Sequence, residues 1–414
     1  MRDMKKNVYL AALFASALGA MACYTVALPA FLSDPARGAI AAGRFFSCLG
    51  LGGILAIFIA KLTARLSGRF AVALYGAIMA LGAGVAYASV VGTLNTATLA
   101  LAMFILGAGQ FAALGRVQAR VVGEARPAKA VPYIFLTATA TWISVQFLIS
   151  AQAPTFFLAT VGFSLLLTFL SLVGPGEPRA ESGSETASSS AGAASEAPRR
   201  SNFLAIFFGA PAFFLTIFVS SIFASNFFFA EWGKLARDVF PESNPTAISV
   251  ILQIAEIATL ATLTWLLAKV GGLKRAIVAA LSVSAARYFL LGFAEPTSAV
   301  VAMLAHGVMY VGLQSVVPAL YVDRCFTDES ERKNAQTLLA VAAFAAPSAA
   351  SGLVAETLER AATNADGAIA WSQVFWPAAL VFALVAVVFA IFGRAVDAET
   401  SADNAEASEN ADAA

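Results

Sequence analysis

Apolar runs of about 20 residues recur along almost the whole chain, and they limit its fold more than any other feature. A bilayer needs about 20 apolar residues for a helix to cross it. Six such runs precede residue 175: Asn7–Leu32, Ala39–Ala60, Phe70–Gly92, Thr96–Val122, Ala130–Ser150 and Thr155–Gly174. Six more follow residue 200: Phe203–Trp232, Ala247–Lys269, Ala276–Phe293, Ser298–Val322, Ala335–Ala355 and Ala368–Phe392. The sequence therefore predicts an all-α integral membrane protein with about twelve transmembrane helices.

The composition agrees with a chain that is solvated by lipid. Hydrophobic residues make up 59% of the sequence and charged residues only 12%, about half the charged fraction of soluble proteins. The first apolar run is too long for the core of a secretory signal, and many similar runs follow it. Cys23, Cys48 and Cys325 form no paired motif, so we expect no disulfide framework, metal site or redox centre.

The apolar pattern is interrupted once, and this interruption divides the chain. Residues 175–200 consist largely of Pro, Gly, Ser, Ala and Glu, a composition that cannot bury a core. We expect an N-terminal six-helix half at 1–174, a flexible cytoplasmic linker at 175–200 and a C-terminal six-helix half at 201–394. Residues 395–414 are acidic, and we expect a disordered tail there.

The distribution of positive charge predicts the orientation. If both termini are cytoplasmic, 19 of the 26 Lys and Arg residues fall in cytoplasmic segments. Only Arg37, Lys234, Arg237 and Arg360 then fall in outer loops. Short cytoplasmic loops carry the excess of Lys and Arg in membrane proteins. We therefore expect a multi-pass protein of the cytoplasmic (inner) membrane with both termini in the cytoplasm.

Gln253 and Glu256 are the polar exception within the apolar run Ser249–Trp265. Ionisable side chains within membrane spans are costly, so they usually face a polar cavity, a partner charge or a proton path. The three-residue spacing places both side chains on one face of a helix. We therefore expect that face to line a wet cavity, although Glu256 could instead form a structural ion pair with Arg287, which would be costly to break.

Two six-helix halves joined by a long hydrophilic loop resemble the major facilitator superfamily, in which a substrate site lies between the halves. The loop Lys61–Arg69 is similar to the gating loop of that superfamily, with Ala64 at the position of its acid. The loop either takes part in gating or only fixes the topology. The resemblance implies the major facilitator fold and transport by alternating access.

Several short motifs resemble the nucleoside:proton symporter family of this superfamily. Gln253 and Glu256 form the Q-x-x-E of its eighth helix, and Arg287–Phe289 and Glu295-Pro296 are similar to marks around its ninth. The other matches are His306–Tyr310, Tyr321–Asp323, Ala335-Gln336, Asn226, and a register that includes Pro132, Ile134, Thr139, Trp142 and Ile143. The resemblance implies that Gln253, Glu256, Asn226, Thr139 and Tyr310 bind substrate. It also implies that Glu256, with Arg287, couples transport to protons.

Three positions depart from the family pattern, because Phe135, Phe223 and Val311 stand where an Arg, a Gln and an acid are expected. Fewer hydrogen-bonding groups would alter or weaken substrate choice. Each remaining candidate also has a structural alternative. Asn226 could join two helices, and Thr139 could bond its own helix backbone. His306 is a proton relay or a structural residue at a helix start near the outer surface.

The function that follows is secondary transport of a nucleoside with protons. One alternative is transport of another small solute, such as sugar uptake or export of an amphipathic compound. The other is a sensor of the same fold that transports nothing. No phosphate-binding loop, metal-ligand cluster or nucleophile motif is present in the sequence, so we expect no enzyme activity, cofactor or metal. The expected partners are a small-molecule substrate, protons and the lipid bilayer, with no nucleic acid, and we expect a monomer.

Overall fold

The computed structural model describes residues 2–25, 27–32, 43–63, 65–91, 94–148, 154–175, 203–242, 245–326 and 328–396. Nearly all of these residues are helical, and a single isolated bridge between Thr363 and Ile369 is the only β-type pairing among them. Except for Pro175 and residues 395–396, the predicted linker and tail lie outside the described residues, as does Arg37.

The helices up to Val173 form one bundle and those from Phe203 form a second. The first bundle contains α1 (Arg2–Thr25), α2 (Ala27–Leu32), α3 (Gly43–Ile54), α4 (Ala56–Leu62), α5 (Gly68–Val90), α6 (Thr96–Glu124), η2 (Ala128–Ala130), α7 (Val131–Leu148) and α8 (Thr155–Val173). The second contains α9 (Phe203–Gly209), α10 (Pro211–Ile222), η3 (Phe223–Phe227), α11 (Phe228–Val239), α12 (Pro245–Val270), α13 (Leu273–Leu291), α14 (Pro296–Leu313), α15 (Val316–Cys325), α16 (Glu329–Ala340), η4 (Val341–Ala345), α17 (Ala346–Ala362) and α18 (Trp371–Phe392).

Within the described residues, nine helical segments are long and apolar enough to cross a membrane, and the bent pair α9 and α10 makes a tenth. Two further segments complete the twelve predicted spans. One is α7, a shorter apolar helix. The other is α13, whose 19 residues include the basic residues Lys274, Arg275 and Arg287. The prediction of an all-α membrane protein with two six-helix halves is confirmed.

The predicted span Phe203–Trp232 differs most from the observed helices. It is broken at Ala210, and α9 and α10 meet there at 93°. Pro211 occupies the first turn of α10. The N–H groups of a first turn have no partner within the helix, so the missing N–H of proline removes no hydrogen bond there. A proline inside a longer helix would interrupt that helix. The second of these helices continues through η3 and α11 to Val239.

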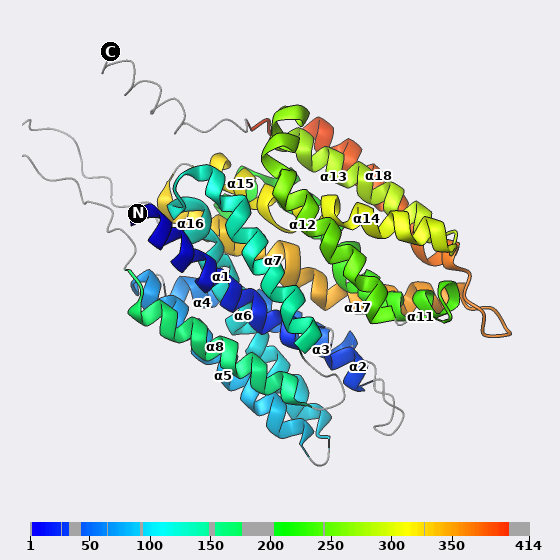
Figure 1. The fold of residues 1–414 in the computed structure, drawn as a ribbon, viewed down its shortest axis with the longest axis horizontal. Coiled ribbons are helices and arrows are strands. Elements are labelled where there is room, and N and C mark those ends of the chain that lie inside the picture. Colours follow the sequence, from blue (N-terminus) through cyan, green and yellow to red (C-terminus); the bar gives the residue numbers. More distant parts are fainter. Residues whose placement is uncertain are drawn as a thin grey trace, which may run out of the picture.

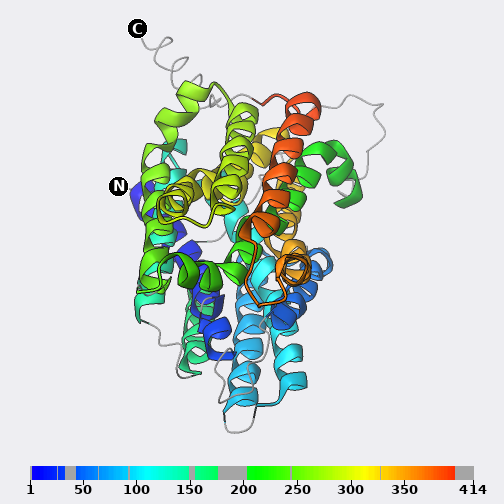
Figure 2. The ribbon, with the colours of Figure 1, turned by 90° about the vertical axis from the view of Figure 1, so that its right-hand side faces the viewer.

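The two bundles lie side by side (Figure 1). The pairs α5 with α8 and α13 with α18 are packed together at opposite edges of the molecule (Figure 1). Between them, α7 contacts α12, α3 contacts α17 and α6 contacts α16, so these helices form the interface of the halves. The turned view shows the same division, with the C-terminal bundle above the N-terminal one (Figure 2).

The halves approach closely where α6 meets α16, as they also do where α3 meets η4 and α17. A Cβ atom added to Gly115 would lie 2.7 Å from the Cα atom of Thr337. Real Cβ atoms do not come so near to backbone, so only glycine permits this approach. Small residues allow membrane helices to pack at short distance. The two halves are therefore closed against each other at this end of α6.

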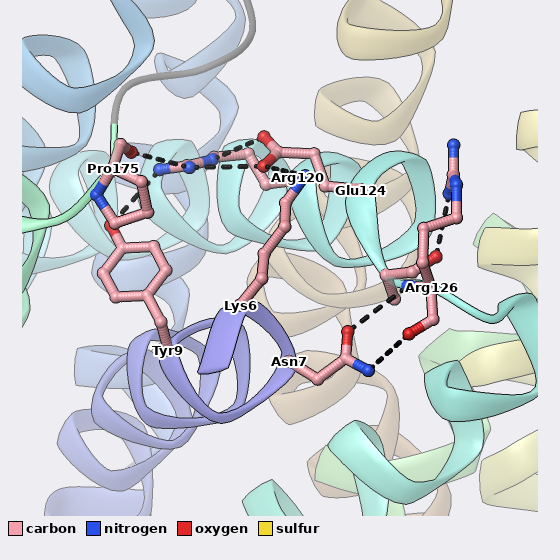
Figure 3. Close-up of polar contacts among 8 residues, drawn as sticks. Lys6, Asn7, Tyr9, Arg120, Glu124, Arg126 and Pro175 are labelled. Atoms are coloured by element: carbon pink, nitrogen blue, oxygen red, sulfur yellow. Dashed lines mark hydrogen bonds and ion pairs between the residues drawn. The ribbon is translucent and has the colours of Figure 1, made fainter. Parts of the chain in front are cut away.

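A polar cluster braces the same end of the N-terminal half (Figure 3). The buried guanidinium of Arg120 on α6 donates to Glu124 Oε1 at 2.9 Å and to the carbonyl oxygen of Pro175 at 3.3 Å, and it lies 5.5 Å from the ring centroid of Tyr9 on α1. Lys6 pairs with Glu124 at 3.4 Å. These contacts hold the first turns of α1 against the last turns of α6, at the point where the predicted linker begins.

Candidate functional site

A cavity lies between the two halves and receives side chains from both. It contains about 640 Å³ of space that no atom fills, a volume that includes open solvent. Its lining from the N-terminal half is Leu18, Met21, Thr25, Thr139 and Trp142. Its lining from the C-terminal half is Phe229, Gln253, Glu256, His306, Tyr310, Gln314 and Phe344.

The structure brings four of the five predicted substrate residues to this cavity. Gln253 and Glu256 reach it from α12, Thr139 from α7 and Tyr310 from α14. The fifth, Asn226, belongs to η3, but its side chain lies outside what the structure describes. The polar face of α12 and the candidate residues of α7 and α14 thus meet in one place, although they are far apart in the sequence.

Irregular backbone surrounds the cavity in the C-terminal half. The π-helix η4 contains Phe344, and Gln314 stands at the break between α14 and α15. The π-helix η3 ends two residues before Phe229. Such bulges and breaks free backbone hydrogen-bonding groups, and in membrane proteins they are tolerated where they are buried or line a cavity. Their position is typical of a transporter binding site.

Glu256 and His306 are in direct polar contact in the cavity. The Nε2 atom of His306 lies 3.0 Å from Oε1 of Glu256. Both side chains are buried, with exposed fractions of 3% and 10%. His306 lies within α14, one turn before Tyr310, so it is not at a helix start as the sequence led us to expect. The i, i+4 spacing of these two residues is the signal that would have placed both on one face.

Arg287 does not form the ion pair with Glu256 that the sequence led us to consider. Its Nε atom donates to the carbonyl oxygen of Ala302 at 3.1 Å. Its guanidinium carbon lies 4.2 Å from the ring centroid of Phe228 and 5.0 Å from that of Tyr288. Among the described residues no ion pair joins Arg287 to Glu256, because the guanidinium is fully buried against aromatic rings instead.

The three apolar departures from the family pattern lie outside the cavity lining. Phe135 is buried edge-on against Phe14, with ring centroids 4.6 Å apart. Phe223 packs against Phe227 within η3. Val311 is buried, and the adjacent Gly312 faces α13, where an added Cβ would lie 2.3 Å from Cβ of Ala280. These three side chains pack against apolar neighbours and are not part of the cavity lining.

Sequence reasoning missed part of the lining. Leu18, Met21 and Thr25 recur at spacings of three and four residues and therefore share one face of α1. That face was not singled out, because Leu and Met on a helix are equally typical of packing against other helices. Gln314 and Phe344 gave no signal, because their exposure to the cavity depends on the irregular backbone around them.

The lining combines aromatic faces with groups that form hydrogen bonds. Trp142, Phe229 and Phe344 offer ring faces, while Thr139, Gln253 and Tyr310 offer donors and acceptors. Such a site suits an uncharged molecule that has both a flat ring and several polar groups. No group of three or more His, Cys, Asp or Glu side chains that could hold a metal ion occurs in the part of the chain described.

Comparison with protein families decides what kind of molecule this is. The family of nucleoside H+ symporters matches residues 4–398, almost the full length of the sequence. The chain belongs to the nucleoside:proton symporter family. It is a multi-pass membrane transporter and not an enzyme, and the function of its family is the transport of nucleosides with protons. A search of curated protein sequences found no match.

Solved structures confirm the major facilitator fold of this symporter. A crystal structure of the nucleoside transporter NupG has a TM-score of 0.64 at 15% identity, over 93% of this chain and 98% of that one. The human organic anion transporter MFSD10 has a TM-score of 0.70 at 14% identity, over 94% and 100%. The Escherichia coli fucose:proton symporter FucP has a TM-score of 0.66 at 16% identity, over 95% and 100%.

Proposed function

We propose that the cavity between the halves is the nucleoside site of this symporter. The observation that carries the proposal is the meeting of Thr139, Gln253, Glu256 and Tyr310 in one cavity at the interface of the halves. Hydrogen bonds from Gln253, Thr139 and Tyr310 would hold the polar groups of the ribose and the base. The rings of Trp142 and Phe229 would cover the apolar faces of the nucleoside base. Asn226 remains a candidate contact.

Glu256 is proposed to carry the coupling proton. It is the only acidic residue that lines the cavity described here, and no permanently charged side chain of the described residues lies within ion-pair distance of it. Its charge is therefore offset only when a proton binds. Arg287 contributes to coupling as the nearby buried cation behind Phe228, and not as a direct ion-pair partner.

The test of this assignment is uptake of labelled uridine into proteoliposomes under an imposed pH gradient. Glu256→Gln keeps the size and hydrogen-bonding capacity of the side chain but cannot release a proton. We expect the variant to exchange uridine at equal pH on both sides and to lose accumulation driven by the gradient. Accumulation equal to that of the unmodified protein would refute the role of Glu256.

The orientation and the membrane are also proposals. The excess of Lys and Arg in the predicted cytoplasmic segments supports cytoplasmic termini in the inner membrane. The closed contact of α6 with α16 then lies at the cytoplasmic side. Reporters fused at residue 200 and at the C-terminus should both be found in the cytoplasm. A reporter found on the outer side at either position would contradict this orientation.

The substrate range is open to one direct measurement. A thermal-shift screen of the purified protein with nucleosides, sugars and amphipathic cations should give the largest stabilisation with nucleosides, since a ligand stabilises the state that binds it. Phe135 and Phe223, two of the apolar departures expected to alter substrate choice, lie outside the cavity lining. A larger shift with sugars or amphipathic compounds, and none with nucleosides, would contradict the proposed site.

A further inference from the structure

His306 occupies the centre of a stacked column that reaches from a buried cation to the cavity. The guanidinium of Arg287 lies over Phe228 at 4.2 Å. Phe228 and His306 stack with ring centroids 6.4 Å apart, and His306 and Tyr310 stack at 6.2 Å. The column fixes the plane of the imidazole, so its Nε2 atom is aimed at Glu256.

The other ring nitrogen of His306 has no hydrogen-bond partner among the described residues. Its Nδ1 atom is buried and forms no hydrogen bond within the described structure. The tautomer of a histidine is normally set by the hydrogen bond of the nitrogen that does not bind the functional group. No described residue accepts a hydrogen bond from Nδ1 or donates one to it, so both tautomers of the imidazole are open to this residue.

The charges that face the imidazole come from three packed helices. Glu256 reaches it from α12, and Tyr310 stacks on it from α14 itself. Arg287 and, beyond it, Tyr288 approach from α13 on the far side of Phe228. Among these groups, the carboxylate of Glu256 is the charge in direct contact with the ring, and the guanidinium of Arg287 is separated from the ring by the phenyl group of Phe228.

We propose that Glu256 and His306 bind the transported proton together, as one unit. The inference rests on the proposed role of Glu256 and adds a second proton-binding residue to it. In the unloaded unit, Nε2–H donates to the carboxylate and Nδ1 carries no proton, so the net charge is −1. One proton from the outer solution neutralises the unit. It gives either a carboxylic acid that donates to Nε2 or an imidazolium beside the carboxylate, with Nδ1–H in both forms.

These two loaded forms differ only in the position of one proton along the 3.0 Å contact. The unit can therefore be neutral without a full charge on either side chain. A net charge in the membrane interior is costly, so the neutral, loaded unit favours the movement of the halves that carries the nucleoside across. Release of the same proton to the cytoplasm restores the charge and completes the cycle.

The test separates proton coupling from substrate binding. His306→Gln retains a hydrogen-bonding group but cannot take up a proton, and His306→Asn is a second, smaller variant. Labelled uridine is measured in proteoliposomes as exchange at equal pH and as accumulation under a pH gradient. We expect exchange to fall by a smaller factor than accumulation, because Gln253, Thr139 and Tyr310 still offer hydrogen bonds to the substrate. We expect accumulation to be lost and its pH dependence to become flat.

The variants of Glu256 distinguish this inference from the function on which it rests. If the two residues act as one unit, Glu256→Gln, His306→Gln and the double variant should show the same loss of accumulation, since effects within one unit are not additive. Normal accumulation and pH dependence in His306→Gln, with loss in Glu256→Gln, would overturn the shared unit and leave Glu256 as the sole proton carrier. Normal accumulation in Glu256→Gln would overturn both.

A measurement on the unmodified protein does not depend on the folding of any variant. His306 is the only histidine in the sequence, so ¹³C-labelled histidine gives infrared bands from one residue alone. We expect its imidazole bands and a buried carboxyl band to change together over the same pH interval. A carboxyl band that titrates while the imidazole bands stay constant would overturn the proposal.

Discussion

Gln253 is the uncharged polar residue that accompanies Glu256 on the cavity face of α12. Replacing it with Ala removes an amide that can both donate to and accept from a nucleoside. We expect uridine to bind about 5- to 10-fold more weakly, since a hydrogen bond to a neutral group contributes about 1 kcal/mol. Binding of labelled uridine to the purified protein measures this change.

The matched control is its neighbour Ile254→Ala. Ile254 is 57% exposed on the outer face of the same helix, so its truncation should leave uridine affinity unchanged. Weaker binding in both variants would show that α12 responds as a whole to any change. Unchanged binding in Gln253→Ala alone would remove this residue from the site.

Arg287 provides a second test at the scale of a residue. Arg287→Lys keeps the positive charge but loses the planar stacking on Phe228 and the Nε–H bond to Ala302. We expect a loss of about 1–3 kcal/mol of stability, because lysine cannot replace a stacked guanidinium. The thermal midpoint in detergent measures it. Arg360→Lys is the control, since Arg360 is 77% exposed in a pair with Glu356 and surface pairs contribute little.

The residues of the cavity were predictable to different degrees, for physical reasons. A carboxylate in an apolar run is costly, so the sequence was enough to infer that Glu256 faces something polar. Its partner was not predictable in the same way. Arg287 and His306 are both polar residues in neighbouring helices, and only packing determines which of them reaches the carboxylate. Aromatic stacking against Phe228 holds Arg287 away from it, and His306 takes that place.

The elements α12 and α14 are held at short distance by a glycine. A Cβ atom added to Gly307 would lie 2.1 Å from the carbonyl oxygen of Ala255. Gly307 adjoins His306, and Ala255 adjoins Glu256. We therefore expect Gly307→Ala to push the helices apart, to cost about 1–3 kcal/mol of stability as in other overpacked sites, and to reduce proton-driven accumulation of uridine.

The control for this prediction is Gly162→Ala in α8. An added Cβ there meets nothing within 4 Å. Alanine is favoured over glycine inside a helix by about 1 kcal/mol, so the thermal midpoint should stay the same or rise. A Gly307→Ala variant with unchanged midpoint and unchanged accumulation would show that the contact of the two helices does not hold the Glu256–His306 pair.

Element boundaries followed the apolar pattern closely except where the backbone is irregular. Apolar composition and length suffice to predict a membrane helix. They do not reveal the two π-helices, because one extra residue in a turn leaves a continuous apolar run unchanged. The bend at Ala210 had a signal in Pro211, but proline also occurs inside membrane helices when neighbouring groups satisfy the backbone. The irregular segments adjoin the cavity, which is why they matter for function.

At the scale of the whole molecule, two six-helix halves could be predicted from the interrupted series of apolar runs. The apolar runs did not predict which helices of one half contact the other half. Every span is apolar, so hydropathy does not separate a lipid-facing helix such as α18 from one at the interface of the halves. Contacts such as that of Gly115 with Thr337 depend on shape. Such contacts also indicate where a substitution can shift the equilibrium between the closed and open conformations of the cavity.

Gly115→Leu should destabilise the contact of α6 with α16, because the leucine side chain would clash with the backbone of Thr337. The halves must then separate at that end, and the cavity should open more often toward the cytoplasm. A shift of about 1.4 kcal/mol in this equilibrium changes the ratio of the two conformations about tenfold. Uptake should slow, since a transporter must pass through both conformations in each cycle.

Accessibility of the cavity measures this shift directly. Thr139→Cys is introduced on a background in which the three native cysteines are serine, and inside-out vesicles are treated with an impermeant maleimide. Labelling of Cys at this position from the cytoplasmic side should rise in Gly115→Leu. Gly123→Leu on the same helix is the control, because an added Cβ there meets nothing within 4 Å. Equal labelling in the two variants would mean that the α6–α16 contact does not close the cavity, whereas a rise in Gly115→Leu alone identifies that contact as the cytoplasmic gate.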